Sequence, residues 1–460
     1  MMEWIGDHLA VLMFLVLTVI MFVGYPVAFV LGGVALAFGA IGILFDVFRP
    51  AQFGSLMPRI FGQAVQNPVL IAVPMFVFMG TILEKSGVAD ELLKALQVLT
   101  RRIPGGLAMS VTIMGTIMAA TTGIVGASVI MLTLIALPTM LAAGYSKELS
   151  TGTIASAGTL GILIPPSIML VIMGDLLTIS VGTLFTAAIV PGLVVSMLYL
   201  IYQGTLAFAK PHLAPPLHID IGPKTSGEMV RLVLRSFLPP AALIFVVLGS
   251  IFGGFATPTE AGGTGSAGAL LLAAFNKRLN MKMLKEVIES AALTNALVFF
   301  IIFGATLFSF VFRALGGDDL VVEILQNLGI DSGWEIMIFV MALVFVMGFF
   351  FDWLEICLVV LPIFAPILTK LSFEPHLATN KDFMLWFTIV IAVNLQSAFL
   401  TPPFGFALFY MKGTVPKSVT MQHIYRGIIP FVMLQLLAVT LCLIFPEIVL
   451  WLPRRFGFLD

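Results

Sequence analysis

The sequence predicts an all-α polytopic membrane protein that contains two inverted repeats. Of its 460 residues, 60% are hydrophobic and 10% are charged, and the mean hydropathy is +1.11. Soluble domains are about half apolar and about a quarter charged. Several apolar stretches approach or reach the roughly 20 residues that a transmembrane helix requires. They include Leu9–Val23, Ile71–Leu83, Leu184–Tyr202, Ala292–Phe312 and Phe431–Trp451.

Composition excludes several classes of protein. The formal net charge is −1, which gives no basic surface for nucleic acid. Cys357 and Cys442 lie in apolar runs, so neither a disulfide framework nor a cysteine metal site is expected. An intramembrane enzyme requires a cluster of catalytic groups at membrane depth, and the sequence contains none. We therefore expect no enzyme activity and no cofactor.

The distribution of basic residues indicates the orientation of the predicted helices in the membrane, because short cytoplasmic loops are enriched in lysine and arginine. With the N-terminus outside, the cytoplasmic side receives all but seven of the 23 basic residues. Those seven are Arg49, Arg59, Arg313, Lys370, Lys381, Arg454 and Arg455. This distribution favours an N-terminus on the outer side of the lipid bilayer.

Matched glycines and prolines define the repeat. The pairs are Gly80 and Gly304, Pro138 and Pro362, Pro165-Pro166 and Pro402-Pro403, and Pro191 and Pro430, with separations of 224, 224, 237 and 239. Each half is predicted to cross the membrane five times, and an odd number of crossings inverts the second copy. Inverted repeats with interrupted helices are typical of transporters and place a binding site near the membrane midplane.

Polar interruptions give the order of the elements. The first repeat, 1–209, is predicted to contain scaffold helices at 9–85, a hairpin at 107–143, a broken helix at 150–175 and a helix at 181–207. The segment 210–235 is the least apolar part of the chain and carries four prolines, which indicates a cytoplasmic linker. The second repeat, 236–460, is predicted to contain scaffold helices at 236–315, a hairpin at 334–370, a broken helix at 384–411 and a helix at 427–452.

Each double proline interrupts an apolar run. Proline removes a backbone donor, and such breaks survive in hydrocarbon only when they are buried in protein or line a polar cavity. The residues upstream of the breaks offer hydroxyls, amides and carbonyls, which are the hard oxygen ligands that alkali cations favour. Half-helices that begin at Pro166 and Pro403 would direct positive N-terminal ends at the midplane and attract an anionic substrate. The alternative is a pair of structural kinks without a ligand.

Two short-armed hairpins flank the breaks. The small residues of 119–128 separate two apolar arms that are too short to span comfortably, which predicts a re-entrant hairpin. The offset of 224 places Asp352 opposite Ser128, and Glu355 follows three residues later. Carboxylates inside an apolar segment indicate function by default. The alternative is a tip that protrudes into water, where the two charges are only solvated.

Three motifs resemble the large membrane subunit of tripartite ATP-independent periplasmic (TRAP) transporters. They are GTIASAGTLGILIPPSIMLVIMG at Gly152–Gly174, AATTGIVGASVIMLTLIALPTMLAAGY at Ala119–Tyr145 and GFATPTEAGGTGS at Gly254–Ser266. The resemblance implies an elevator-type secondary transporter of the bacterial inner membrane, driven by sodium as the coupling ion. It also implies a soluble periplasmic binding protein and a small four-helix membrane subunit. No four-helix segment is fused here, so that subunit is expected as a separate chain.

The resemblance assigns the cation sites to sodium, with no other metal expected. The sodium candidates are Thr121, Thr122, Gly123, Gly126, Ser128, Gly158, Thr159, Gly161, Asp352, Ser397 and Thr401. The substrate candidates are Ser128, Pro165, Pro166, Ser167, Asp352, Glu355, Asn394, Pro402 and Pro403. The second tip, FFFDWLEICLVVLP, is similar to the subgroup linked to 2-oxo acids, hydroxy acids, mannitol or chloroaromatic compounds. The expected substrate is therefore a small organic acid, either a 2-oxo or hydroxy carboxylate or a dicarboxylate. A stand-alone carboxylate symporter that needs no binding protein is the alternative.

Overall fold

The computed structural model describes residues 8–122, 125–217, 225–330, 332–371, 373, 376–377, 379–402 and 405–459, but not the side chains of residues 119–122 and 226. Among these residues the regular structure is helical throughout. Seven of the described helices are long and apolar enough to cross a membrane, or eight if a pair bent by 58° counts as one span. The predicted all-α polytopic membrane fold is therefore confirmed.

The first repeat begins with a scaffold. Its helices are α2 (Leu9–Val23), α3 (Val27–Leu44), α4 (Pro50–Gly54), α5 (Leu56–Ile60), the π-helical turn η1 (Phe61–Val65), α6 (Ala72–Lys85) and α7 (Val88–Thr100). A hairpin follows, then a broken helix and a long helix. These elements are α8 (Gly106–Thr122), α9 (Val125–Ala142), α10 (Lys147–Thr159), the 3₁₀ turn η2 (Leu160–Ile162), α11 (Ile168–Leu176) and α12 (Val181–Ala209).

The second repeat has the same order of elements. After the short turn η3 (Pro211–Leu213), its scaffold comprises α13 (Ser226–Phe252), α14 (Pro258–Phe275), α15 (Met281–Ala314) and α16 (Gly317–Asn327). The hairpin, broken helix and final helices are α17 (Gly333–Met347), α18 (Trp353–Leu368), α19 (Asn380–Leu400), α20 (Phe406–Thr414), α21 (Met421–Ile444) and α22 (Glu447–Arg455).

N-cap side chains and glycines mark the first residues of several of these helices. Hydroxyl side chains of Ser146, Thr257, Ser332 and Thr379 accept hydrogen bonds from backbone N–H groups in the first turns of α10, α14, α17 and α19. Such caps satisfy donors that a helix start leaves unpaired. The two scaffold arms α7 and α16 both follow a glycine in the left-handed region, Gly87 at φ 75° and Gly316 at φ 78°, a conformation that favours glycine.

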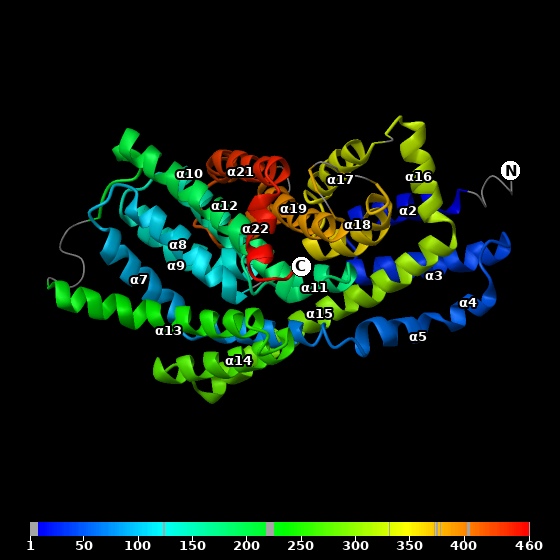
Figure 1. Cartoon of the computed structure of the whole chain (residues 1–460). Helices are drawn as coiled ribbons and strands as arrows, with labels where there is room; N and C mark the ends of the chain where they lie inside the picture. The colour runs from blue at the N-terminus through cyan, green and yellow to red at the C-terminus, as the bar shows by residue number, and fades with distance from the viewer. Residues whose placement is uncertain are drawn as a thin grey trace.

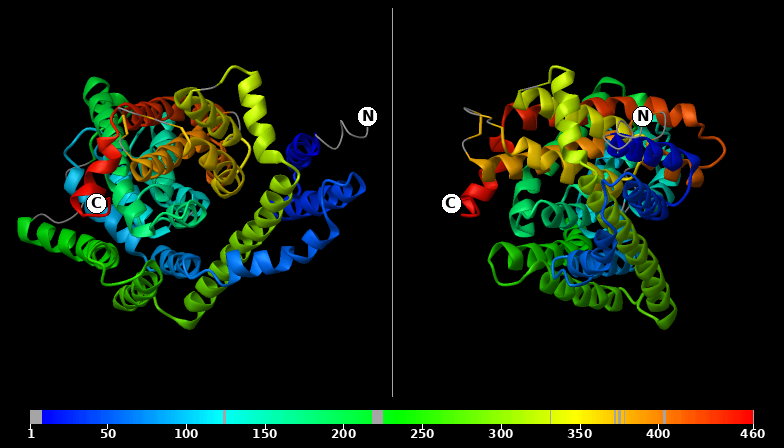
Figure 2. Two further views of the ribbon diagram at one scale, coloured as in Figure 1. Left: turned by 45° about the vertical axis from the view of Figure 1, so that its right-hand side comes forward. Right: turned by 90° about the vertical axis from the view of Figure 1, so that its right-hand side faces the viewer.

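The helices form two assemblies, which Figures 1 and 2 show from three directions. Helices α3, α6, α13, α14 and α15 pack on one another and pass round one side of the molecule. The hairpins and broken helices gather into a compact body, in which α10 packs on α8, α9 and α21, and α19 packs on α17, α12 and α21. The body therefore combines equivalent elements from both repeats.

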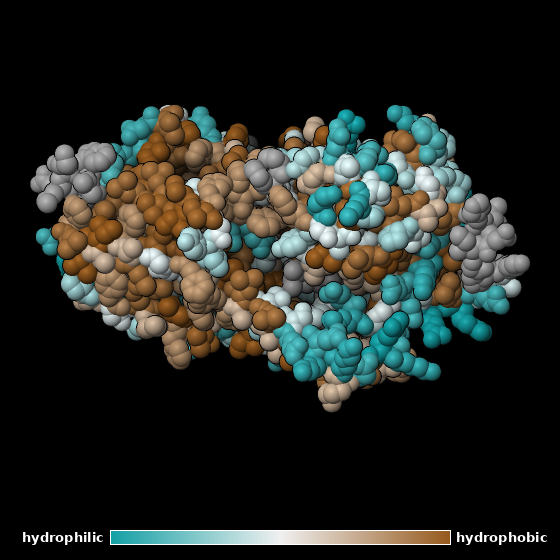
Figure 3. All heavy atoms as spheres, turned by 180° about the vertical axis from the view of Figure 1, so that it is seen from behind, coloured by the Kyte–Doolittle hydropathy of each residue, from teal (hydrophilic) through white to brown (hydrophobic). Residues whose placement is uncertain are grey.

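Much of the outer surface is apolar, as Figure 3 shows for one face. The side chains of Phe245, Phe255 and Phe275 on or beside α13 and α14 are 77%, 87% and 77% exposed. Aromatic side chains of this size are normally buried when water is the solvent. Their exposure fits a scaffold whose surroundings are lipid or another membrane helix.

The structure differs from the expected elements in two places. The linker predicted at 210–235 is shorter, because α13 already begins at Ser226 and its amphipathic first turns extend over residues 226–235. The helix predicted at 427–452 is divided, since α21 ends at Ile444 and α22 begins at Glu447 after Pro446. Proline cannot donate the backbone hydrogen bond that would continue α21.

Close contact between α10 and α21 depends on two glycines. A Cβ atom at Gly152 would overlap the carbonyl oxygen of Gly427, and a Cβ atom at Gly427 would overlap the carbonyl oxygen of Glu148. Both obstacles are backbone atoms, which cannot rotate away. Small residues that let helix backbones approach are typical of membrane helix interfaces.

We predict that Gly152→Ala and Gly427→Ala each destabilise the protein by roughly 1–3 kcal/mol, the usual range for overpacking. The measurement is the thermal unfolding midpoint of the detergent-solubilised protein. Gly249→Ala and Gly263→Ala are matched controls, because an added Cβ there meets nothing within 4 Å. Equal midpoints for all four variants would contradict the assigned contact.

Candidate functional site

The first break lies between α10 and α11. Helix α10 continues through Thr159, and the non-helical segment Leu163–Ser167 carries Pro165 and Pro166, which are joined by a cis peptide bond. Because neither proline has an N–H, the carbonyls of Gly161 and Ile162 lose the donors that a continuous helix would supply. The Ser167 hydroxyl donates to the carbonyl of Ile162. The neighbouring N–H groups of Leu163 and Ile164 do not serve the Gly161 carbonyl, because both donate to the carbonyl of Leu160.

The second break lies between α19 and α20. The backbone leaves the helix at Thr401, and α20 begins at Phe406. The Thr401 hydroxyl donates to the Ser397 carbonyl over 2.8 Å, and the Gly405 N–H donates to the Thr401 carbonyl over 3.1 Å. The Asn394 side-chain amide donates to the Met341 carbonyl of α17 over 2.8 Å. This amide therefore fixes the hairpin to the broken helix.

One hydrogen bond joins the two broken helices. Gln396 Nε2 lies 3.5 Å from Thr159 Oγ1, and both side chains are fully buried. Gln396 and Thr159 are 237 positions apart, the same separation as the two double prolines. Contact between equivalent residues places the pseudo-two-fold axis of the repeats between them. Gln396 Oε1 is buried and has no hydrogen-bond partner in the described part of the chain.

The hairpins enclose both breaks through close contacts. An added Cβ at Gly158 would meet the Val129 side chain of α9, and one at Gly348 would overlap the Cβ of Ala398 in α19. Each second hairpin arm also contacts the half-helix of the other repeat, α9 against α20 and α18 against α11. Gly126 illustrates the first of these contacts, since a Cβ there would lie 2.9 Å from the Tyr410 ring.

A capping box forms the tip of the second hairpin. Asp352 Oδ1 accepts a hydrogen bond from the Trp353 N–H over 2.8 Å, and Glu355 Oε2 accepts one from the Asp352 N–H over 3.2 Å. Glu355 is 9% exposed and lines a small cavity together with apolar residues of α2 and α3. These two carboxylates therefore hold the tip, and Glu355 is not solvated.

Several of the predicted site residues lie in one central cluster. Gly126, Ser128, Gly158, Thr159, Gly161, Ser397 and Thr401 occupy the hairpin arms and the broken helices that pack together there. Ser128 is 5% exposed inside α9. The side chains of Thr121 and Thr122, and the whole of Gly123 and Pro403, lie outside the described structure.

The structure corrects two details of the predicted site. The half-helices do not begin at the second prolines, because α11 begins at Ile168 and α20 at Phe406. Ser156, Gly158, Thr159 and Ser397 are still helical, so the described non-helical backbone is Leu163–Ser167 at the first break and starts at Thr401 at the second. Gln396 lies upstream of the second break, where the sequence predicts oxygen ligands, but it is not among the sodium or substrate candidates, although its separation of 237 from Thr159 is visible in the sequence.

The chain is similar to a family of membrane transport proteins. Residues 14–448 match the family model described as the tripartite ATP-independent periplasmic transporter, DctM component. The C4-dicarboxylate TRAP transporter large permease protein DctM of Pseudomonas aeruginosa is 30% identical over 432 residues, which cover 91% of this chain and 93% of the relative. The sialic acid TRAP transporter large permease protein SiaM of Vibrio cholerae is 25% identical, with 95% and 96% covered.

Relatives at similar identity differ in substrate. The ectoine/5-hydroxyectoine TRAP transporter large permease protein UehC of Ruegeria pomeroyi is also 30% identical, over 96% of this chain and 98% of the relative. Among solved structures, the YdaH transporter of Alcanivorax borkumensis is similar with a TM-score of 0.61 and 15% identity, and 98% of each chain is covered. This similarity concerns the fold alone.

We predict that Gln396→Met lowers the initial rate of uptake at least tenfold without lowering thermal stability. The substitution removes a buried, unpaired carbonyl oxygen, and burying such an oxygen without a partner costs about 1–3 kcal/mol. Uptake by proteoliposomes and the thermal midpoint are measured together. Gln203→Met is the control for stability, since Gln203 donates to Thr112 over 2.7 Å and to Thr153 over 3.3 Å, while its Oε1, like that of Gln396, is buried without a partner in the described part of the chain. A lower midpoint with normal uptake would make Gln396 a structural residue only.

We predict that Asp352→Ala destabilises the second hairpin tip by roughly 0.5–2 kcal/mol, the usual effect of losing an N-cap, and reduces uptake. Asp352→Asn should retain most of both properties, because an asparagine oxygen also caps a helix. The control is Ser332→Ala, which removes the cap of α17 at the other end of the same hairpin. Equal loss of uptake in Asp352→Asn and Asp352→Ala would show that the negative charge itself is needed.

Proposed function

Because the chain belongs to the DctM component family of tripartite ATP-independent periplasmic transporters, we propose that it carries out sodium-coupled uptake of a small organic acid across the bacterial inner membrane. In this proposal, a soluble periplasmic binding protein delivers the acid. A separate small four-helix subunit completes the membrane unit.

Family membership by itself gives the coarser part of this function. The chain is the large permease subunit of a secondary transport system, a multi-pass membrane protein and not an enzyme. Such a system also contains a small membrane subunit and a periplasmic binding protein. The sodium coupling, the substrate and the movement of the transporting part are our proposals.

The junction of the broken helices carries the proposal of sodium coupling. Thr159, Gln396 and the Gly161 carbonyl place neutral oxygen atoms where the two repeats meet. Neutral and carbonyl oxygens are suitable ligands for a hard cation. A buried Gln396 oxygen without a protein partner is costly in the absence of a ligand, so a bound sodium ion gives this side chain a physical role.

The division into scaffold and body supports an elevator movement. Thr100 bonds to Gly106 and Ser110 where α7 leads into α8. Away from that turn, the described residues show two hydrogen bonds between scaffold and body, from Asn67 Nδ2 to Asp175 Oδ1 over 2.6 Å and from Arg313 Nη2 to the Pro362 carbonyl over 2.7 Å. By contrast, close glycine contacts hold α10 to both α9 and α21 inside the body. We infer that the body moves as one unit past the scaffold.

An organic anion is the substrate that the site favours. The half-helices α11 and α20 begin just after the breaks, and helix N-termini attract negative groups. Relatives named for C4-dicarboxylate, ectoine and sialic acid are 25–30% identical to this chain. Overall sequence identity therefore does not indicate which acid this chain transports. Identifying the ligand of the cognate binding protein would show which acid it is.

We predict that uptake by proteoliposomes containing both membrane subunits requires an inward sodium gradient and the binding protein. Candidate acids are offered as radiolabelled succinate, pyruvate and lactate, and uptake should fall at least tenfold when choline replaces sodium on both sides. Empty liposomes and heat-inactivated binding protein are the controls. Full uptake in choline would contradict sodium coupling. Full uptake without the binding protein would instead support a stand-alone carboxylate symporter.

A further inference from the structure

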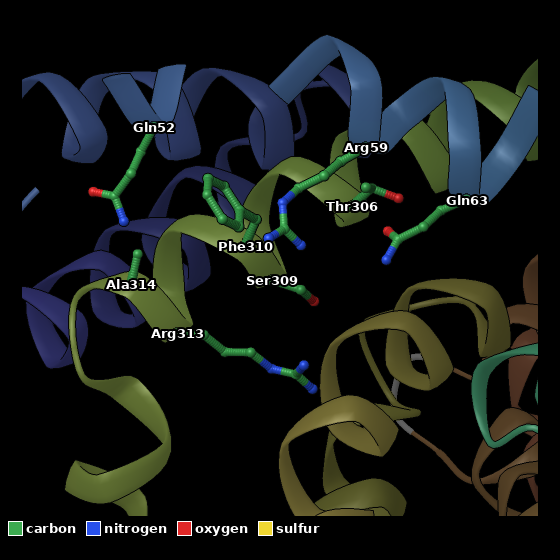
Figure 4. A pocket seen from close by; sticks show the side chains of 8 residues that line it. All are labelled: Gln52, Arg59, Gln63, Thr306, Ser309, Phe310, Arg313 and Ala314. Atoms are coloured by element: carbon green, nitrogen blue, oxygen red, sulfur yellow. The ribbon is translucent and has the colours of Figure 1, made fainter. Parts of the chain in front are cut away.

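A polar cavity of about 400 Å³ lies in the scaffold, outside the junction of the broken helices. Two polypeptide segments form it, one running from α4 to η1 and the other at the end of α15 (Figure 4). Its lining residues are Gln52, Arg59, Gln63, Thr306, Ser309, Phe310, Arg313 and Ala314. No carboxylate lines this cavity among the described residues.

Helical spacing explains why these side chains meet. Thr306, Phe310 and Arg313 are four and three residues apart on α15, and Arg59 and Gln63 are four apart on the other segment. Residues at these spacings share one face of a helix. The two polar faces therefore oppose each other, and Figure 4 shows Arg59, Gln63, Thr306 and Ser309 directed toward the space between them.

The positive charge of this cavity is only partly compensated. Arg313 donates to the Pro362 carbonyl, and its Nε lies 3.6 Å from Asp318 Oδ2. Arg59 lies over the Phe310 ring, 4.2 Å from the centroid, and has no ion pair recorded within the described structure. A guanidinium carries five N–H donors in a planar fork. The contact with Phe310 orients this fork and leaves its donors available.

A second cavity of about 310 Å³ continues the first toward the body. It shares Gln63, Thr306, Ser309 and Arg313 with the first and adds Asn67 and Asp175. The Asp175 carboxylate accepts the hydrogen bond from Asn67 here. Charge therefore changes from positive around Arg59 to negative at Asp175, so an anion is held more favourably in the first cavity than in the second.

We propose that the cavity between Arg59 and Arg313 is an anion-binding vestibule that receives the carboxylate of a small organic acid before it reaches the broken helices. The proposal rests on the proposed function only in taking the anion to be the transported acid. Arg59 pairs with the carboxylate through its two parallel N–H groups, a geometry that suits carboxylate and phosphate alike. Ser309 and Gln63 donate further hydrogen bonds, and Phe310 limits the space on one side.

The vestibule occupies the end of the molecule where the distribution of basic residues places the outer side. Arg59 and Arg313 are two of the seven basic residues that remain outside in that orientation. A cavity with uncompensated positive charge raises the local concentration of anions and their rate of arrival. This position suits capture of an acid released at the outer surface.

The test uses the reactivity of a cysteine placed inside the vestibule. Ser309→Cys is introduced into the otherwise unchanged chain, because Cys357 and Cys442 are both buried. The protein, in nanodiscs of phosphatidylcholine, is treated with a negatively charged sulfonatoethyl or a positively charged trimethylammonioethyl methanethiosulfonate. We expect the anionic reagent to react several-fold faster than the cationic one. Succinate, pyruvate or lactate should slow the reaction in a saturable manner.

Two matched charge removals control this measurement in the Ser309→Cys chain. Arg59→Gln should lower the ratio of anionic to cationic rates at least fivefold and abolish protection by the acids. Arg49→Gln removes an equal charge from an exposed position that does not line the cavity, and it should leave both properties unchanged. Equal effects of the two substitutions, or protection by none of the three acids, would overturn the proposal.

A lipid phosphate is the other source of an anion, and a second nanodisc composition distinguishes it. If phosphatidylglycerol protects Ser309→Cys without added acid, and the acids add nothing, the vestibule binds a lipid headgroup and the proposal fails. The labelling needs neither a sodium gradient nor the binding protein. If the labelling is as expected but sodium-dependent uptake is not observed, the proposed function is therefore contradicted, whereas the assignment of the vestibule as an anion-binding site is still supported.

Discussion

The need to satisfy backbone polar groups away from water governs this structure. Two apolar helices are interrupted by double prolines, which withdraw N–H donors from carbonyls at membrane depth, and such groups are tolerated only inside protein or beside a polar cavity. The two hairpins meet this need by packing over both breaks, and Ser167 replaces one lost donor directly. The central arrangement of the body follows from enclosing two short segments of irregular backbone.

Enclosure requires backbones to approach closely, which explains the distribution of small residues. Gly158 admits the side chain of Val129, Gly348 admits Ala398, and Gly152 and Gly427 bring α10 against α21. Apolar burial gives little selectivity among helices when lipid is equally apolar, so packing and hydrogen bonds determine which helices associate. Small residues that look unremarkable in the sequence therefore determine which helices can pack around the breaks.

The scaffold has a different chemical character from the body. Its exposed aromatic side chains suit an apolar surrounding, while its inner faces at α5, η1 and α15 present arginines, amides and hydroxyls toward the body. Polar contacts such as that between Asn67 and Asp175 can break and re-form, unlike interlocked glycine contacts. This contrast is the physical basis for our proposal that the body moves and that the scaffold guides it.

The sequence by itself determined the membrane class, the family resemblance, the repeat and the positions of both breaks, because hydropathy and proline chemistry act through neighbouring residues. Tertiary structure decided which carbonyls remain unpaired, that α13 begins inside the expected linker, and that Asp352 and Glu355 cap a helix. It also brought Gln396 to Thr159 and Arg59 to Arg313. These pairs are distant in the chain, and residue spacing specifies the face a side chain occupies but not the helix that faces it.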